Sequence, residues 1–161
     1  GAGEFILTSA FSPDGATVAG ASWSGVVPVW DVATGKKIRT ISVGMNGTRP
    51  ARAYYVEFSP NGKLVLTACS DGETQLRDAS TLQIARTLPT EGVAIHAAVF
   101  QPSDGGLRLI TAGADGYLRV WDVTRDARSA AALAQLEARH GHWRLAGGRL
   151  ERRAAAAPPS R

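Results

Sequence analysis

The sequence is poor in the residues that most often bind metals. It has one cysteine, Cys69, and three histidines, His96, His140 and His142. One cysteine excludes an internal disulfide framework, and its place at the end of an apolar stretch favours a buried structural thiol over a nucleophile. The histidines are scattered and lack the Cys, His or Asp neighbours of a ligand set. We therefore predict no metal site.

Motifs for catalysis and nucleotide binding are also missing. The chain contains Ser, His and Asp residues, but it has no nucleophile elbow that would organise them into a triad. The stretch from Gly44 to Gly47 lacks the lysine and the following helix of a phosphate-binding loop. We predict neither enzymatic activity nor a bound cofactor.

No long hydrophobic run is present either. The longest apolar runs span no more than six residues, whereas a membrane-crossing helix needs roughly 20. The first residues do not show the basic and then apolar pattern of a signal peptide. We expect a soluble, cytoplasmic protein.

The net charge of +4 is unevenly distributed. Residues 1–123 contain ten Lys and Arg against eleven Asp and Glu, whereas residues 124–161 contain eight against three. A nearly neutral body has no electrostatic reason to seek phosphate backbones, so nucleic acid is not the expected partner. The alternative, nucleic-acid binding through the basic tail, would show a steep salt dependence that is lost with residues 124–161.

Three stretches of the chain repeat one pattern of a turn followed by a β-hairpin. In each hairpin, a turn residue and a strand residue are six positions apart, and a phenylalanine-containing turn comes before it. The pairs are Ser24 and Trp30, Asp71 and Arg77, and Asp115 and Trp121, and the turns begin at Phe11, Phe58 and Phe100. The phenylalanines recur after 47 and 42 residues. A period of roughly 40 to 45 residues with four short strands is typical of a β-propeller blade.

The β-formers between the turns predict individual strands. We predict blades at about 4–43, 53–88 and 93–136, with strands at 16–21, 26–30, 37–43, 54–58, 64–68, 73–77, 82–88, 93–100, 107–112 and 117–121. Pro28 lies within one of them. Because proline has no backbone N–H, its nitrogen must face a gap, a bulge or a sheet edge.

The FSPDG and FSPNG turns, the SDG and ADG turns and the two VWDV runs resemble the WD-repeat β-propeller family over about residues 4–123. The resemblance implies an all-β fold, a partial β-propeller of about three four-stranded antiparallel blades. It also implies a structural hydrogen-bonded set of His, Ser or Thr, Asp and Trp in each repeat. The matching residues are Trp30, Thr67, Asp71, Thr111, Asp115 and Trp121.

The chain departs from this set in several places. Gly20 and Ser24 replace the Thr and Asp of the first unit, and Arg49 and Glu91 stand where the histidine is expected. The Trp121 indole N–H can still donate to the Thr111 hydroxyl, which would give a buried donor its partner.

Residues 124–161 form an Ala- and Arg-rich tail after the propeller segment at 1–123. Its composition predicts a possible helix at 126–139 and disorder from about residue 144, although part of this tail should supply the outer strand of the third blade. A basic interaction tail and an arbitrary truncation are the alternatives. Because the chain starts within a blade without an initiator methionine, we expect a segment of a longer protein.

We predict a non-enzymatic protein–protein interaction scaffold. Its partners would be other proteins or the remaining blades of the same propeller. The alternative is a regulatory or sensor segment of a larger signalling enzyme, a kinase or NTPase, with its catalytic domain outside these residues. Successive loops of a meander fall on alternate ends, and one end collects a mixture typical of interface hot spots: Trp23, Met45, Arg49 and Arg52.

Overall fold

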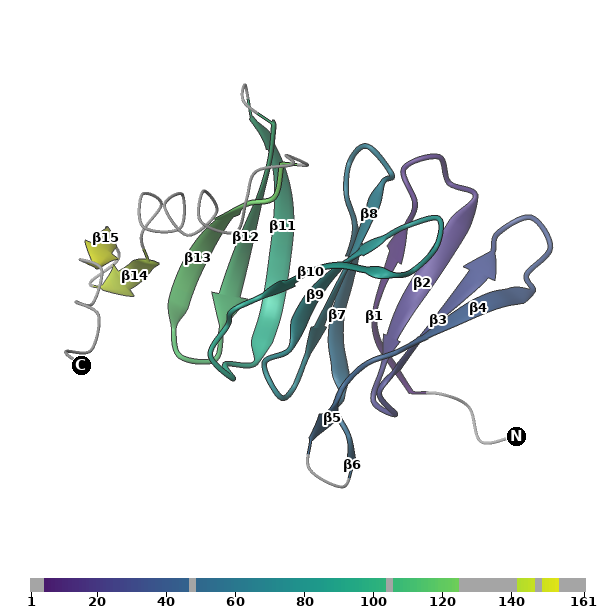
Figure 1. Ribbon diagram of the computed structural model, residues 1–161, viewed down its shortest axis with the longest axis horizontal. Coiled ribbons are helices and arrows are strands. Elements are labelled where there is room, and N and C mark those ends of the chain that lie inside the picture. Colours follow the sequence, from purple (N-terminus) through teal and green to yellow (C-terminus); the bar gives the residue numbers. More distant parts are fainter. Residues whose placement is uncertain (1–4, 47–48, 104–105, 125–141, 147–148, 154–161) are drawn as a thin grey trace. The chain divides into compact units, whose positions relative to one another are not determined.

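The computed structural model describes residues 5–46, 49–103, 106–124, 142–146 and 149–153, and these residues form only strands and turns (Figure 1). The strands make three antiparallel sheets and one two-stranded ribbon. The chain divides into two compact units, Gly1–Ala98 and Val99–Arg161, which are described separately below. None of the described residues belongs to a helix long and apolar enough to cross a membrane.

The first unit contains two four-stranded meanders, in which each strand pairs with its neighbours in sequence. The first sheet comprises β1 (Ile6–Phe11), β2 (Thr17–Ser22), β3 (Val26–Asp31) and β4 (Lys37–Ser42), and the second comprises β7 (Ala53–Phe58), β8 (Leu64–Cys69), β9 (Thr74–Asp78) and β10 (Ile84–Leu88). The ribbon of β5 (Met45–Asn46) and β6 (Arg49–Pro50) connects them. The predicted four-stranded antiparallel blades are confirmed here.

Small aliphatic side chains fill the space between these two sheets. The cluster contains residues of both sheets, all at most 6% exposed: Ala19, Ala21, Val27, Val29, Ile41, Ala53, Val56 and Val65. Strand β7 packs against β1 and β2. Burial of this apolar surface is the main stabilising contribution to the unit.

The third sheet has five strands, ordered β11 (Ile95–Ser103), β12 (Gly106–Gly113), β13 (Tyr117–Asp122), β14 (His142–Ala146) and β15 (Arg149–Arg153). Strands β14 and β15 thus lie beyond the blade end predicted at residue 136, in the stretch where we expected disorder from about residue 144. The possible helix at 126–139 lies outside the described residues.

Local sequence explains β14 and β15 better than overall composition does. Ala146 pairs with Arg149, so only Gly147 and Gly148 intervene, and a Gly-Gly pair between two strand-forming runs is a hairpin signal. Pairing of β13 with β14 ties residues beyond 123 to the third sheet. The division between the two compact units lies after Ala98, within β11. The predicted division into a propeller segment at 1–123 and a tail at 124–161 stays a prediction.

The phenylalanine-containing turns of the first two sheets have the same geometry. In the first, Gly15 (φ 70°) donates its N–H to the Ser12 carbonyl at 2.8 Å, and the Ser12 hydroxyl accepts the Thr17 N–H at 2.9 Å. In the second, Gly62 (φ 67°) donates to the Ser59 carbonyl at 2.8 Å, and the Ser59 hydroxyl accepts the Leu64 N–H at 2.9 Å. The sequence repeat is thus a repeat of hydrogen bonds.

Pro28 lies where the sheet tolerates a missing donor. Strand β3 pairs with β2 only from Val29 to Asp31, so the pairing stops one residue short of Pro28. On its other side, Pro28 is opposite Thr40 of β4. The proline therefore faces an interruption in the β2–β3 ladder, as we predicted.

The first sheet exposes apolar side chains on the face opposite its core. Across it, Phe11 pairs with Val18 and Val18 pairs with Trp30, so the three share one face, whereas Ala19 and Val29 belong to the core. Phe11 is 63% exposed. Such a surface favours association in water.

We predict that the 161-residue chain self-associates through this apolar face. Light scattering should show oligomers, and Phe11→Ser should shift the distribution toward monomers because it removes exposed apolar area. Ile84→Ser, at a residue of similar exposure on β10, is the control and should have no such effect. A stable monomeric parent chain would contradict the prediction.

Candidate functional site

Loops of the first unit meet at one end of its two sheets, and we call this end the loop face. It comprises residues 22–25, 44–46, 49–52, 69–72 and 89–92, of which β5 and β6 project beyond the neighbouring strands (Figure 1). The Arg52 N–H donates to the Ser70 hydroxyl at 3.0 Å, and the Ser70 N–H donates to the Arg52 carbonyl at 2.9 Å. The Thr90 hydroxyl donates to the Gly72 carbonyl. These contacts fix the loops to one another.

Trp23 and Arg52 form a stacked pair on the loop face. The guanidinium carbon of Arg52 lies 3.7 Å from the centre of the Trp23 ring, which is the geometry of a cation–π interaction. Trp23 is still 47% exposed, and its backbone N–H donates to the Phe5 carbonyl at 2.9 Å. The pair is therefore both ordered and accessible to a partner.

The other two predicted interface residues lie on the ribbon. Met45 pairs with Pro50, and Asn46 pairs with Arg49, along β5 and β6. The side chains of Met45 and Arg49 lie outside the described part of the chain. The corresponding loop between β12 and β13 belongs to the second unit.

Cys69 is the buried first residue of the 69–72 loop and is not a reactive group. It is 2% exposed at the end of β8. Burial, with smaller contributions from Asp71 and Glu73, raises the pKa of its thiol to about 12. The thiolate that acts as a nucleophile is therefore disfavoured at neutral pH.

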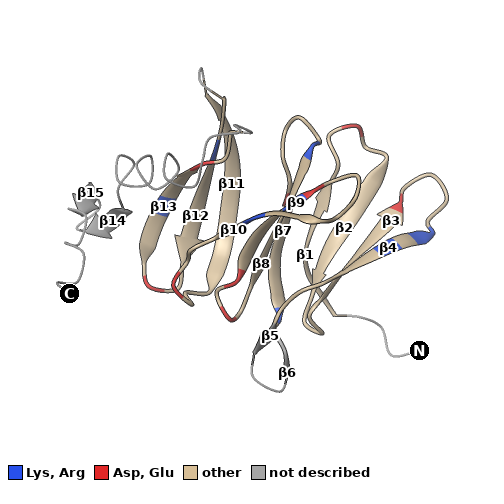
Figure 2. Cartoon of the chain, viewed as in Figure 1, with Lys and Arg blue, Asp and Glu red and all other residues tan. Residues whose placement is uncertain are grey.

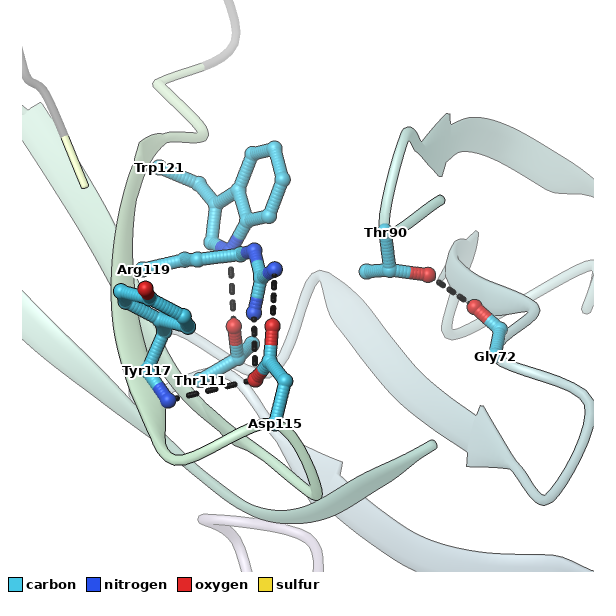
Figure 3. A network of polar contacts seen from close by, with 7 residues as sticks. All are labelled: Gly72, Thr90, Thr111, Asp115, Tyr117, Arg119 and Trp121. Carbon is cyan, nitrogen blue, oxygen red and sulfur yellow. Dashed lines mark hydrogen bonds and ion pairs between the residues drawn. The ribbon is translucent and has the colours of Figure 1, made fainter. Parts of the chain in front are cut away.

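Two polar contacts, one buried and one partly buried, hold the hairpin of the third sheet together (Figure 3). The indole N–H of Trp121 donates to the Thr111 hydroxyl at 2.9 Å, and neither residue is more than 7% exposed. Asp115 accepts two hydrogen bonds from the Arg119 guanidinium, at 3.1 and 2.6 Å, and one from the Tyr117 N–H at 3.2 Å. The hydrogen bonds from Arg119 are the largest cause of the lowered pKa of Asp115.

The hairpin of the second sheet has the same residue spacing, but a different residue at the tryptophan position. Arg77 occupies the position of Trp121, and the Thr67 hydroxyl, ten residues earlier, is buried without a hydrogen-bond partner among the described residues. Asp71 accepts the Glu73 N–H at 2.9 Å. Because arginine stands where the other two hairpins have tryptophan, Thr67 has no indole N–H at this position from which to accept a hydrogen bond.

The first sheet replaces the hydrogen bond by packing. A Cβ at Gly20 would lie 3.1 Å from the ring of Trp30, so this ring covers the glycine closely. The turn residue Ser24 contacts the Ser22 hydroxyl at 2.8 Å, and Ser22 in turn donates to the Val26 carbonyl at 2.6 Å. Each blade therefore stabilises the same hairpin in its own way.

Sequence reasoning missed Arg119 and did not foresee the stacking of Arg52. Arg119 is 5% exposed, and a buried arginine requires a partner such as Asp115. The spacing of four residues between Asp115 and Arg119 could have indicated this ion pair. No local signal exists for Trp23 and Arg52, because they are far apart in sequence.

The described residues contain no group of three His, Cys, Asp or Glu side chains that could hold a metal ion. His96 stacks on Tyr54, with ring centroids 5.6 Å apart. Acidic residues lie mainly at strand ends and in turns (Figure 2), where Asp31 and Asp78 accept turn N–H groups and have lowered pKa values.

The repeat pattern agrees with one protein family. The family model "WD domain, G-beta repeat" matches residues 2–31, 38–78 and 85–122. The chain belongs to the WD40 family. The fold predicted from the sequence, a β-propeller segment of WD repeats, is thereby confirmed.

This WD40 chain spans only a small part of the length of two relatives that it matches. It is 28% identical over 120 residues to Transducin-like enhancer protein 2 of Mus musculus, covering 74% of this chain and 15% of that protein. It is 32% identical over 103 residues to the U3 small nucleolar RNA-associated protein 21 homolog of Schizosaccharomyces pombe (strain 972 / ATCC 24843), covering 64% of this chain and 10% of that protein.

Solved structures support the fold alone. The chain resembles the structure of U3-55K with a TM-score of 0.65 and 20% identity, and the RRP9 WD40 repeats with a TM-score of 0.66 and 19% identity. Each likeness covers 76% of this chain and 37% of the other.

None of these names mentions a kinase or NTPase, so the alternative function gains no support. Because one relative is named as RNA-associated, the expectation that nucleic acid is not a partner stays a prediction.

We predict that Asp115→Ala and Trp121→Ala destabilise the third sheet, whereas Ser24→Ala has little effect. Loss of Asp115 leaves the buried Arg119 without its carboxylate, at a cost of about 1 to 3 kcal/mol, and loss of the Trp121 ring leaves a void, at roughly 3 to 5 kcal/mol. Denaturant unfolding of each variant measures this. Equal midpoints for all three variants and the parent would contradict the prediction.

Proposed function

We propose that this WD40 chain is a non-enzymatic scaffold that binds other proteins through the loop face. The observation that carries the proposal is the stacked pair of Trp23 and Arg52, which is exposed and yet held in place. Tryptophan and arginine are the residue types most enriched among interface hot spots. A partner that covers them would desolvate a large aromatic surface and a planar cation together.

The rigidity of the loop face supports the same proposal. Arg52 is fixed through its backbone to Ser70, and the two sheets that carry the loops share a packed core. Binding to a preformed surface costs less conformational entropy than binding to loops that must first be ordered. Met45 and Arg49 would extend the contact along the ribbon. The cytoplasmic location expected from the sequence stays part of this proposal.

We predict that Trp23→Ala combined with Arg52→Ala weakens partner binding by at least about tenfold, as expected for loss of one or two hot-spot residues. Quantitative affinity capture from the native cell type, with the bait at equal concentration, measures the binding. The far-ultraviolet circular dichroism spectrum should not change, because both side chains are outside the core.

The matched control is Lys63→Ala combined with Ile84→Ala, two exposed residues outside the loop face. It should capture the same proteins as the parent. Equal capture by the Trp23 and Arg52 double variant and by the parent would show that the loop face is wrongly assigned.

A further inference from the structure

The first unit contains an open groove that the proposed function does not use. Its volume is about 470 Å³, and it runs between β4 of the first sheet and the end of β9 with its following turn in the second. The lining residues are Arg39, Thr40, Ile41, Ser42, Arg77, Thr81, Leu82 and Gln83. Two of these residues are arginines, three carry hydroxyl groups, and none is acidic.

Arg77 in this groove is a half-buried cation with mostly neutral partners. Its Nη1 donates to the Leu82 carbonyl at 3.0 Å, and its Nη2 has a long contact of 3.5 Å with the Ser42 carbonyl and a hydrogen bond to the Gln75 amide oxygen. Its Nε is buried without a hydrogen-bond partner among the described residues. Burial lowers the pKa of the guanidinium, because removal from water disfavours its charged form.

Nearby carboxylates compensate Arg77 only in part. Glu73 raises the pKa of Arg77, but Gln75 lies between them in the hydrogen-bond chain: it accepts from Arg77, and its amide N–H donates to the Glu73 carboxylate. Asp78 is engaged by Ser80 and Thr81 in the turn after β9. A buried or half-buried charge is favourable only with a good counter-charge, so the groove offers a positive site that is only partly compensated.

Arg39 adds a second guanidinium at the side of β4. It is exposed, and its Nη1 donates to the Ser80 carbonyl, a neutral acceptor. Two guanidinium groups with hydroxyl side chains around them suit a phosphate group, whose oxygens accept several charge-assisted hydrogen bonds at once.

We propose that this groove binds a phosphate group through Arg39 and Arg77, either as the free ion or as the monoester on a phosphorylated serine of a partner. A long polyanion is not the expected ligand, because residues 1–123 carry ten Lys and Arg against eleven Asp and Glu and provide no extended positive surface. Arg77 stands at the position that holds tryptophan in the other two hairpins. The site therefore exists because this blade departs from the repeat.

Isothermal titration calorimetry of the full chain at constant ionic strength tests the proposal. The probes are inorganic phosphate, a capped Gly-phosphoserine-Gly peptide and the same peptide without phosphate. We expect saturable binding of one or both phosphate-containing probes and none of the unphosphorylated peptide. Binding of the peptide but not of the ion identifies a phosphorylated side chain as the source, and the reverse identifies free phosphate.

Variants locate the binding. Arg39→Gln and Arg77→Gln should each weaken it by at least about tenfold, because charge-assisted hydrogen bonds are lost. Arg77→Trp removes the same cation but can give Thr67 the indole donor that Thr111 has, so it should abolish binding while leaving the unfolding midpoint unchanged or higher. Arg108→Gln, which removes an exposed arginine from the third sheet, is the control for net charge.

The absence of saturable binding to either phosphate probe would overturn the proposal. Equal affinity of the parent and the folded Arg39→Gln or Arg77→Trp variant would also overturn it. The loop-face variants Trp23→Ala and Arg52→Ala should leave phosphate affinity intact, so the groove and the proposed scaffold function fail or succeed separately.

Discussion

All three sheets depend on the turn between their second and third strands. In each turn a glycine with φ between 78° and 84° donates its N–H to the carbonyl three residues earlier: Gly25, Gly72 and Gly116. Residues with a Cβ rarely adopt this backbone conformation, so glycine sets the hairpin. The turn fixes the register of the strands, which places the residue at each tryptophan position near the one ten residues earlier. It also directs the first two of these loops to the loop face.

Because the frame is constant, single substitutions change the chemistry of a blade without changing its fold. Trp121 donates to Thr111, Trp30 packs over Gly20, and Arg77 instead turns its cation toward the groove beside β4. Where tryptophan occupies this position, its contacts stabilise the hairpin. Where arginine occupies it, a partly compensated charge remains, and such departures from a repeat are where specific binding can arise.

Local patterns were sufficient to predict most of the fold, since the predicted strand ends lie within three residues of the structure through β13. The contact of Trp121 with Thr111 was also predictable, because a fixed offset relates the two residues. The outer strands of the third sheet were missed, since the Ala- and Arg-rich composition outweighed the signal of Gly147 and Gly148. The stacking of Trp23 on Arg52 depends on the packing of two sheets, which no local pattern encodes.

The central claim is that the three sheets share one hairpin geometry, and that different contacts at the tryptophan position stabilise it in each sheet. Hydrogen exchange of the tryptophan indole N–H groups, followed by NMR, tests it most directly. The Trp121 proton, bonded to Thr111 and buried, should exchange at least about a hundredfold more slowly than that of the exposed Trp23, because exchange requires opening of the third sheet. Trp30, whose ring packs over Gly20, should be intermediate. Equal exchange rates for Trp121 and Trp23 would contradict the account.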